Sequence, residues 1–267
     1  MIIGNKLFDI KNHTYIMGIL NVTPDSFSDG GNYSDIDKVL FRVEEMIKEG
    51  VDIIDIGGES TRPGYDPITV DEEINRVVPV IEKIKNNFDI PISLDTYKSE
   101  VALCGIKVGV DMINDIWGLK ADDKMAQLIA DYKVVCCLMH NRKKVVYDSF
   151  IKDVVQDLEV SVKLALDAGI LKENIMIDPG VGFGKNYEDN LRILRNIDAL
   201  KVLDYPILLG VSRKSVIGFA LGLPIEERLN GTLALSAYGV MKGCSFLRVH
   251  DIKQNKEVVC MLEAFMA

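Results

Sequence analysis

Residues 15–20 read Tyr-Ile-Met-Gly-Ile-Leu, and residues 21–31 read Asn-Val-Thr-Pro-Asp-Ser-Phe-Ser-Asp-Gly-Gly. The first stretch has the composition and length of a buried β-strand. The second is a polar loop with proline and glycine, and the next helical pattern begins only near Ser34. Strand-to-helix connections usually need about 2–6 residues. A loop of this length directly after a strand therefore indicates a functional loop.

The same unit recurs outward from this stretch: a short apolar run, a polar break and an amphipathic helical pattern. The runs are nearly all apolar and do not alternate, which is typical of parallel strands covered on both faces. Eight such units in about 250 residues predict an α/β protein of the (β/α)8, or TIM, barrel class. A doubly wound open sheet is the alternative. The eight runs are Ile16–Leu20, Asp52–Ile56, Ile90–Leu94, Met112–Ile116, Val134–Met139, Ile175–Ile177, Ile207–Gly210 and Phe246–Val249.

Helices are expected between the strands, and residues 1–14 do not fit the repeat. This N-terminal segment is expected to form a short hairpin that closes the barrel bottom. No Pro/Ser/Gly-rich linker or charge block divides the 267 residues, so residues 1–267 are expected to form a single domain. The clearest helical patterns cover Asp35–Glu49, Val70–Asn86, Phe150–Ala168, Leu191–Val202, Glu226–Met241 and Lys253–Phe265.

Composition narrows the class of protein. The net charge of −9 argues against partners such as nucleic acid or an anionic membrane surface. The N-terminus lacks a signal-peptide pattern, and no apolar stretch reaches the roughly 20 residues that span a bilayer. The five cysteines lack metal-ligand spacing, and Cys136 and Cys137 should point to opposite faces of one strand as buried thiols. A cytoplasmic location is expected.

Polar residues follow nearly every predicted strand. Active sites of this barrel gather at the carboxyl ends of the strands, so these endings should meet at one rim. They include Asn21, Asp55, Asp95, Asn114, His140, Asp178, Ser212 and Arg248.

Asp95, Asn114 and Asp178 should converge on the barrel mouth from three strands. Carboxylates and an amide suit a heterocycle that is rich in N–H donors. Helix capping is the alternative for Asp95 and Asn114, and a turn is the alternative for Asp178. Metal binding by the two aspartates lacks a His-rich or three-carboxylate spacing.

Cationic and aromatic residues mark the later strand ends. Arg248 and His250, two residues apart, should point the same way and suit a phosphate or pyrophosphate; a surface pair is the alternative. Lys214 lies at a predicted helix start, where anions are favoured. Phe183 between two glycines could form the wall of an apolar pocket. His140 could be functional or structural.

Seven segments together resemble the dihydropteroate synthases, the folate-pathway enzymes that sulfonamides inhibit. The resemblance covers nearly the whole chain in order. It implies that the domain condenses 6-hydroxymethyl-7,8-dihydropterin pyrophosphate with p-aminobenzoate to 7,8-dihydropteroate and pyrophosphate, by a dissociative mechanism. The segments are Asn21–Gly31, Asp55–Gly64, Ser93–Thr96, Asn114–Asp115, Asp178–Lys185, Gly210–Gly218 and Arg248–Asp251.

The resemblance also implies roles for individual residues, with Mg²⁺ as cofactor and Asn21 as its ligand. The pterin residues would be Asp95, Asn114, Ile116, Met139, Asp178, Phe183, Gly210, Lys214 and Arg248. The pyrophosphate residues would be Asn21, Thr61, Arg62, Arg248 and His250. The p-aminobenzoate residues would be Phe27, Thr61, Arg62, Pro63, Phe183, Lys214 and Ser215. The residues that act in catalysis would be Asp95, Asp178, Lys214, Arg248, His250 and Arg62.

Two other functions stay open. A methyltetrahydrofolate:corrinoid methyltransferase would share the pterin residues but not need the pyrophosphate residues. A non-catalytic pterin-binding protein would not need a leaving-group site either. The resemblance further implies a homodimer, to which Glu226–Met241 and Lys253–Phe265 could contribute. The stretch Asn141–Lys144 departs from the family pattern, and its effect stays open.

Overall fold

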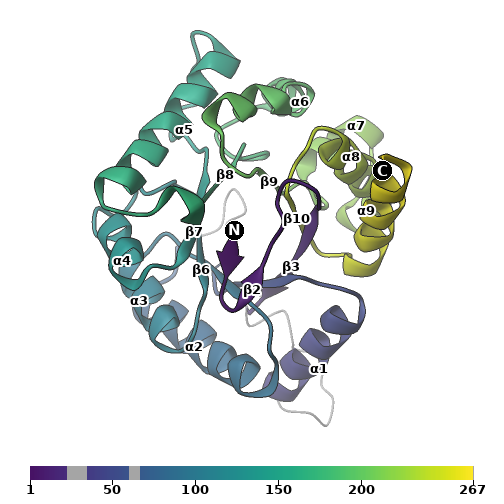
Figure 1. Ribbon diagram of the computed structural model, residues 1–267. Helices are drawn as coiled ribbons and strands as arrows, with labels where there is room; N and C mark the ends of the chain where they lie inside the picture. Colours follow the sequence, from purple (N-terminus) through teal and green to yellow (C-terminus); the bar gives the residue numbers. More distant parts are fainter. Residues whose placement is uncertain (23–34, 60–66, 267) are drawn as a thin grey trace.

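The computed structural model describes residues 1–22, 35–59 and 67–266 (Figure 1). Eight parallel strands form the central sheet, in the order β8-β7-β6-β5-β4-β3-β10-β9. A parallel bridge between Ile177 and Ile207 joins the two ends of this order and closes the barrel. Strands that are consecutive in the chain are neighbours, whereas a doubly wound sheet reverses its order. The (β/α)8 barrel prediction is confirmed.

The strands begin and end within two residues of their predicted bounds. β10 has the bounds predicted for it, while β9 keeps only two of its four predicted residues. The strands are β3 (Tyr15–Asn21), β4 (Ile53–Gly57), β5 (Ile92–Asp95), β6 (Met112–Asp115), β7 (Val135–Met139), β8 (Ile175–Asp178), β9 (Leu208–Leu209) and β10 (Phe246–Val249).

Helices surround the sheet, and none that the structure describes is long and apolar enough to cross a membrane. Two helices, predicted at Leu191–Val202 and Glu226–Met241, differ from their predicted bounds by more than one residue. The first of them starts earlier, at Tyr187, because the Asn186 side chain accepts from the Asp189 N–H (2.8 Å). It ends where the Asn196 side chain donates to the Arg192 carbonyl. The helices are α1 (Asp35–Lys48), α2 (Val70–Asn87), α3 (Ser99–Lys107), α4 (Met125–Tyr132), α5 (Phe150–Asp167), α6 (Tyr187–Arg195), α7 (Ser215–Leu221), α8 (Leu229–Met241) and α9 (Ile252–Met266).

In both predicted helices, part of the sequence forms a short 3-10 helix instead of an α-helix. Ile197–Leu203 follows α6, and Ile225–Glu227 lies after Pro224 and before α8. α8 therefore starts at Leu229, three residues after the predicted start at Glu226.

Side-chain alternation divides the buried apolar residues into two clusters. The larger cluster lies between strands and helices and includes Cys136, whereas the smaller one fills the barrel interior and includes Cys137. The opposite orientation predicted for these two thiols is confirmed. The interior cluster also contains Met17, Met112 and Phe246, so the lower barrel is a packed core.

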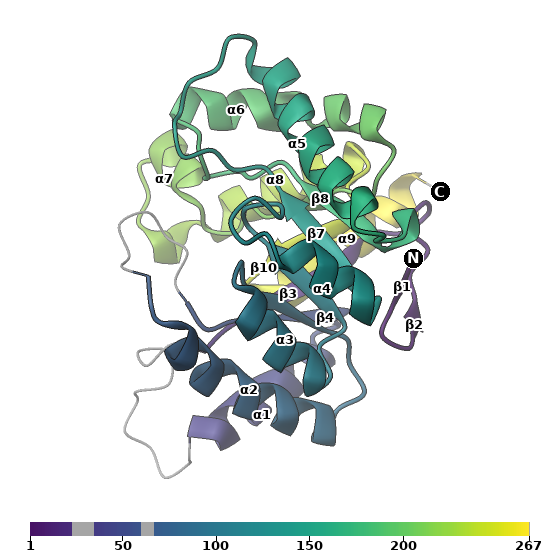
Figure 2. The ribbon, with the colours of Figure 1, turned by 90° about the vertical axis from the view of Figure 1, so that its left-hand side faces the viewer.

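The N-terminal hairpin closes the lower end of the barrel, as predicted. Its strands β1 (Ile2–Ile3) and β2 (Lys6–Leu7) pair antiparallel. Figures 1 and 2 show the hairpin across one end of the ring of strands. Phe8 belongs to the interior cluster, and its ring centroid lies 4.8 Å from Tyr15 and 5.9 Å from Phe246.

Replacing Phe8 with alanine should lower the free energy of unfolding by about 3 kcal/mol, because it empties a closed aromatic cluster. Urea denaturation measures this change. Leu7→Ala is the matched control, since Leu7 is 77% exposed while Phe8 is 3% exposed. Equal stability of the two variants would contradict a structural role for the hairpin.

Candidate active site

A network of charged side chains crosses the upper barrel interior. The Arg248 guanidinium donates from Nε to Asp55 Oδ2 (2.6 Å) and from Nη2 to Asp95 Oδ2 (2.6 Å). Asn114 Nδ2 donates to the same Asp55 oxygen at 3.4 Å. These residues come from β4, β5, β6 and β10, whose carboxyl ends the closed barrel brings together. Two of the three residues predicted to converge on the barrel mouth, Asp95 and Asn114, are thus joined through Asp55 and Arg248.

The helix-capping alternative for Asp95 and Asn114 is wrong. The residue that precedes α3 is Lys98, and Asp95 binds Arg248. The neighbouring Asp115 accepts from the Trp117 and Leu119 N–H groups (both 2.8 Å), so it and not Asn114 stabilises the turn after β6. The surface-pair alternative for Arg248 is also wrong, because only 19% of its side chain is exposed.

Two carboxylates in this network have acceptor capacity to spare. Asp55 Oδ1 and Asp95 Oδ1 are both buried, and neither has a hydrogen-bond partner among the described residues. Burial raises the pKa of Asp95 although Arg248 opposes the shift. Burial also opposes the charged form of Arg248, but Asp55 and Asp95 outweigh this effect and raise the pKa of the guanidinium. A buried acceptor without a donor costs about 1–3 kcal/mol, so this site is built for a ligand with N–H groups.

Asp178 completes the carboxylate set from the end of β8. Its Oδ1 accepts from the Gly180 N–H at 2.6 Å, so the turn alternative describes one of its two oxygens. A Cβ placed on Gly210 would lie 3.8 Å from Asp178 Oδ2 and 3.7 Å from Lys214 Nζ. Glycine at this position therefore leaves open the space between the carboxylate and the ammonium. Burial raises the pKa of Asp178, against the field of Lys214.

Lys214 lies directly before α7, whose first residue is Ser215. Its Nζ donates to the Val181 carbonyl and lies 4.9 Å from the centroid of the Phe183 ring. Burial lowers the pKa of Lys214 to about 8, while Asp178 favours its charged form. The structure therefore joins Phe183, Gly210 and Lys214 beside Asp178, as the sequence predicted.

Ile116 and Met139 provide apolar surface at the same rim. Both are buried, yet they are the two buried apolar residues of the described chain that belong to neither core cluster. Met139 is paired in register with Asp178, two residues above the inward-facing Cys137. Their position suits contact with the faces of a flat ring.

Arg248 and His250, which were predicted to bind the pyrophosphate together, have different partners. His250 follows β10 instead of lying on it, and its Nδ1 is 2.9 Å from Ser212 Oγ. Arg248 binds the carboxylates. Asn21 ends β3 opposite Gly57, where a Cβ would lie 3.7 Å from Asn21 Oδ1 and 3.8 Å from Asp95 Cβ. The amide oxygen of Asn21 and the Asp95 side chain therefore lie on the same side of Gly57.

His140 proves structural. It is fully buried, with Nε2 3.0 Å from Asp157 Oδ2 and Nδ1 2.7 Å from Lys185 Nζ. Burial lowers the pKa of His140 to about 4, so the imidazole is neutral near pH 7.

Neither Asp55, which the strand pattern placed at the rim, nor Lys185 was predicted to have a role in the site. Asp55 could have been identified, because it is the single charged residue inside the apolar strand β4. The predicted residues Phe27, Thr61, Arg62 and Pro63 lie outside the described residues.

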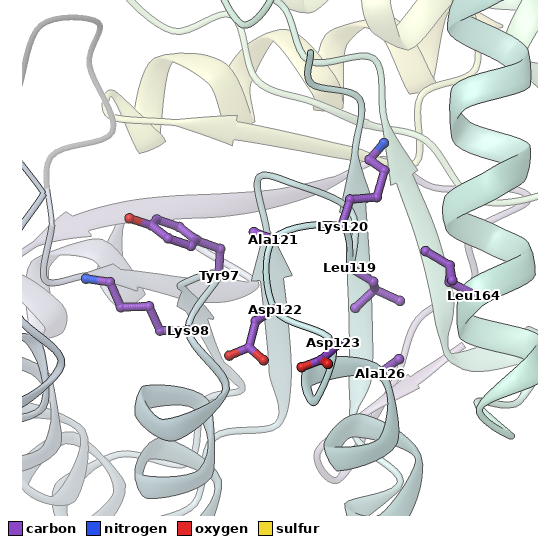
Figure 3. Close-up of a pocket in the computed structure, with 9 residues that line it drawn as sticks. All are labelled: Tyr97, Lys98, Leu119, Lys120, Ala121, Asp122, Asp123, Ala126 and Leu164. Atoms are coloured by element: carbon purple, nitrogen blue, oxygen red, sulfur yellow. The ribbon is translucent and has the colours of Figure 1, made fainter. Parts of the chain in front are cut away.

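A separate cleft of about 710 Å³ opens outside the barrel mouth, between the loops after β5 and β6 and helix α5. Figure 3 shows Tyr97 and Lys98 on one side and Leu164 on the other, with Asp122 between them. None of the predicted site residues that the structure describes lines this cleft. The Lys98 ammonium at its edge is bound within the protein, since it donates to Glu59 Oε2 (2.5 Å), Glu73 Oε2 (2.7 Å) and the Ile68 carbonyl (2.9 Å).

Known proteins share both this sequence and this architecture. A family model for pterin binding enzymes matches residues 17–250. The dihydropteroate synthase of Clostridium beijerinckii is 55% identical over 264 residues, which cover 98% of each chain. A Clostridium difficile dihydropteroate synthase crystallised in the presence of pteroic acid is 48% identical, with a TM-score of 0.94 over 97% of this chain and 99% of that one.

A third relative was solved with a different ligand. The Xanthomonas albilineans dihydropteroate synthase structure with 4-aminobenzoic acid is 38% identical, with a TM-score of 0.92 over 96% of this chain and 94% of that one. The family match covers most of the chain, and these identities extend over nearly all of it. The chain therefore belongs to the pterin binding enzymes and, among them, to the dihydropteroate synthases.

Proposed function

We propose that this enzyme binds 6-hydroxymethyl-7,8-dihydropterin pyrophosphate in the barrel mouth and joins its methylene carbon to the amine of p-aminobenzoate. The observation that carries the binding mode is the pair of buried, unpartnered carboxylate oxygens, Asp55 Oδ1 and Asp95 Oδ1. A pterin edge presents several N–H donors, and Asp95, Asn114 and Asp178 offer acceptors to them. Ile116 and Met139 would contact the ring faces.

The same residues suit a dissociative reaction. The bond between the methylene carbon and the pyrophosphate oxygen breaks, and its electron pair leaves with pyrophosphate. The remaining cation is delocalised into the pterin ring. Asp55, Asp95 and Asp178 bring three carboxyl groups to the mouth, where they would stabilise positive charge on the ligand. The amine of p-aminobenzoate attacks this carbon and afterwards loses one proton.

Asn21, Arg248 and His250 would lie toward the leaving pyrophosphate. Among the described residues, no three His, Cys, Asp or Glu side chains form a metal site. This donor set still fits Mg²⁺, because the ion commonly takes few protein ligands and completes its shell with substrate phosphates and water. Asn21 Oδ1 would supply the protein ligand, and the bound ion would neutralise charge on the leaving group.

The p-aminobenzoate pocket would form on the Lys214 side of the mouth. Phe183 supplies an apolar ring there, Lys214 a cation for the carboxylate and Ser215 a hydroxyl at the start of α7. Thr61, Arg62, Pro63 and Phe27 complete this proposal from the family resemblance, in which Thr61 and Arg62 would also bind the pyrophosphate.

We also propose a homodimer formed through α8 and α9 in a cytoplasmic enzyme. Apolar side chains on these helices are exposed in the single chain, among them Met241, Met261 and Phe265. Large exposed apolar patches favour association. Sedimentation velocity measures the state directly, and a monomer at micromolar concentration would contradict the dimer.

The activity is tested by coupled detection of pyrophosphate. Release should require both substrates together, and a sulfonamide should compete with p-aminobenzoate. A corrinoid methyltransferase would instead demethylate methyltetrahydrofolate without releasing pyrophosphate. A non-catalytic protein would bind the pterin without any turnover. Either of those two results would reject the proposal.

A further inference from the structure

Two rim loops, residues 140–147 after β7 and residues 180–185 after β8, meet backbone to backbone. Gly180 has φ +67°, and a Cβ there would lie 1.9 Å from the His140 carbonyl oxygen. Gly184 has φ +54°, and its Cβ would lie 2.7 Å from the Arg142 nitrogen. The Tyr147 hydroxyl donates to the Gly184 carbonyl at 2.5 Å. The two loops therefore pack as one unit.

Lys185 lies at the centre of this unit. Its Nζ contacts His140 Nδ1 (2.7 Å), the Gly180 carbonyl (2.9 Å) and the Phe183 carbonyl (3.0 Å). An ammonium has three N–H donors, and these three acceptors use all of them. Two of the acceptors belong to the glycine loop, so Lys185 fixes the backbone on both sides of Gly182.

His140 and Asp157 support Lys185 from the other loop and from α5. The neutral His140 accepts at Nδ1 and donates from Nε2 to Asp157 Oδ2 (3.0 Å), which fixes its tautomer. Arg142 forms an ion pair with the same carboxylate, and its guanidinium lies 4.4 Å from the Tyr147 ring centroid. Arg142, in the stretch that departs from the family pattern, thus supports the glycine loop.

The loop that Lys185 fixes also carries the proposed p-aminobenzoate wall. The Phe183 ring faces Lys214 Nζ, and the Val181 carbonyl accepts from that same ammonium. Movement of the loop would therefore displace the ring and the cation together. Asp95 and Asn114, which belong to other strands, would not be displaced.

We propose that Lys185, through His140 and Asp157, is a positioning residue that holds Phe183 and Lys214 in place for p-aminobenzoate. This inference rests on the proposed function, which assigns Phe183 and Lys214 to that substrate. Lys185 itself contacts neither substrate.

The test is a double-mutant cycle on KM for p-aminobenzoate. Lys185→Met should raise this KM about tenfold, a loss of about 1.4 kcal/mol. The Kd of the pterin pyrophosphate, measured by calorimetry, should rise by a clearly smaller factor, because Asp95 and Asn114 keep their positions. Phe183→Ala should also raise the KM. Because Lys185 acts partly through Phe183, Lys185→Met should raise the KM by a clearly smaller factor in the Phe183→Ala background than in the wild-type background.

Lys85→Met is the matched control, because Lys85 is likewise a half-buried lysine whose ammonium is bound, here by the Asp111 carboxylate (2.6 Å) and the Ile90 carbonyl (3.4 Å), but it lies away from this loop. It should leave the KM unchanged in both backgrounds. If Lys185→Met does not fold, Asp157→Asn with and without Phe183→Ala carries the same cycle, since Asp157 is partly exposed.

The positioning role would be overturned if Lys185→Met raised the KM for p-aminobenzoate by the same factor with and without Phe183→Ala. It would also be overturned if Lys185→Met raised the Kd of the pterin pyrophosphate as much as it raised this KM. A wild-type enzyme that releases no pyrophosphate would instead overturn the proposed function. The two failures are therefore distinguishable.

Discussion

Replacing Asp178 with asparagine is expected to lower kcat/KM about 100-fold or more, because a buried donor replaces an acceptor and a negative charge is lost. Asp178 Oδ1 already accepts from the Gly180 N–H at 2.6 Å. If the amide oxygen keeps that bond, the new NH2 group points toward Lys214 and the bound pterin, which are donors. If the amide rotates, its NH2 group meets the Gly180 N–H. Neither rotamer satisfies all groups.

Steady-state assays of pyrophosphate release give kcat and KM for this variant, and its thermal melting shows whether it folds. Asp198→Asn is the matched control, because Asp198 pairs with Lys242 (3.1 Å) on an exposed surface. That control should retain full activity. A folded Asp178→Asn enzyme with turnover within fivefold of wild type would remove Asp178 from the proposed mechanism.

The barrel could be predicted from the sequence because its evidence is local and repeated. Each strand is a short apolar run, and eight repeats make an error in one run unimportant. Helix bounds were less predictable because single side chains decide them. The Asn186 cap starts α6 four residues before the predicted start, and Asn196 ends it. Periodicity does not contain that information.

The rim was predictable for the same reason as the barrel. Once eight parallel strands close, residues at their carboxyl ends meet, so Asp95, Asn114 and Arg248 converge although they are far apart in the chain. Their bonding partners were not predictable. Arg248 pairs with Asp55 across 193 positions, and sequence spacing cannot indicate which of the rim carboxylates it selects. Lys185 was missed because a lysine after a glycine loop is usually exposed.

This pairing makes Arg248→Met the variant with the largest expected effect on stability. Arg248 is the cation that both Asp55 and Asp95 contact, each at 2.6 Å. Removing one partner of a buried ion pair costs about 3–5 kcal/mol, because it leaves uncompensated charge in the interior. The variant should therefore be much less stable than wild type at neutral pH, and it should lose turnover.

The loss of stability should depend on pH in a defined direction. Burial raises the pKa of Asp95 in the folded state and Arg248 opposes this shift, so removing the guanidinium should raise that pKa further above its unfolded value. The folded variant then binds more protons than the unfolded chain, so its stability is highest at low pH and falls as pH rises through the raised pKa. The difference in unfolding free energy between wild type and variant should thus be larger at pH 8 than at pH 5.

Urea denaturation at both pH values measures this difference. Arg42→Met is the control, because Arg42 pairs with Glu45 (3.4 Å) and Glu49 (3.5 Å) at the partly exposed surface of α1. Such pairs contribute about 0–1 kcal/mol, with little dependence on pH in this range. Arg248→Lys keeps one charge but not the two-pronged geometry, so it should recover only part of the stability. A deficit for Arg248→Met that is equal at pH 5 and pH 8 would mean that Asp55 and Asp95 find other partners when the guanidinium is removed.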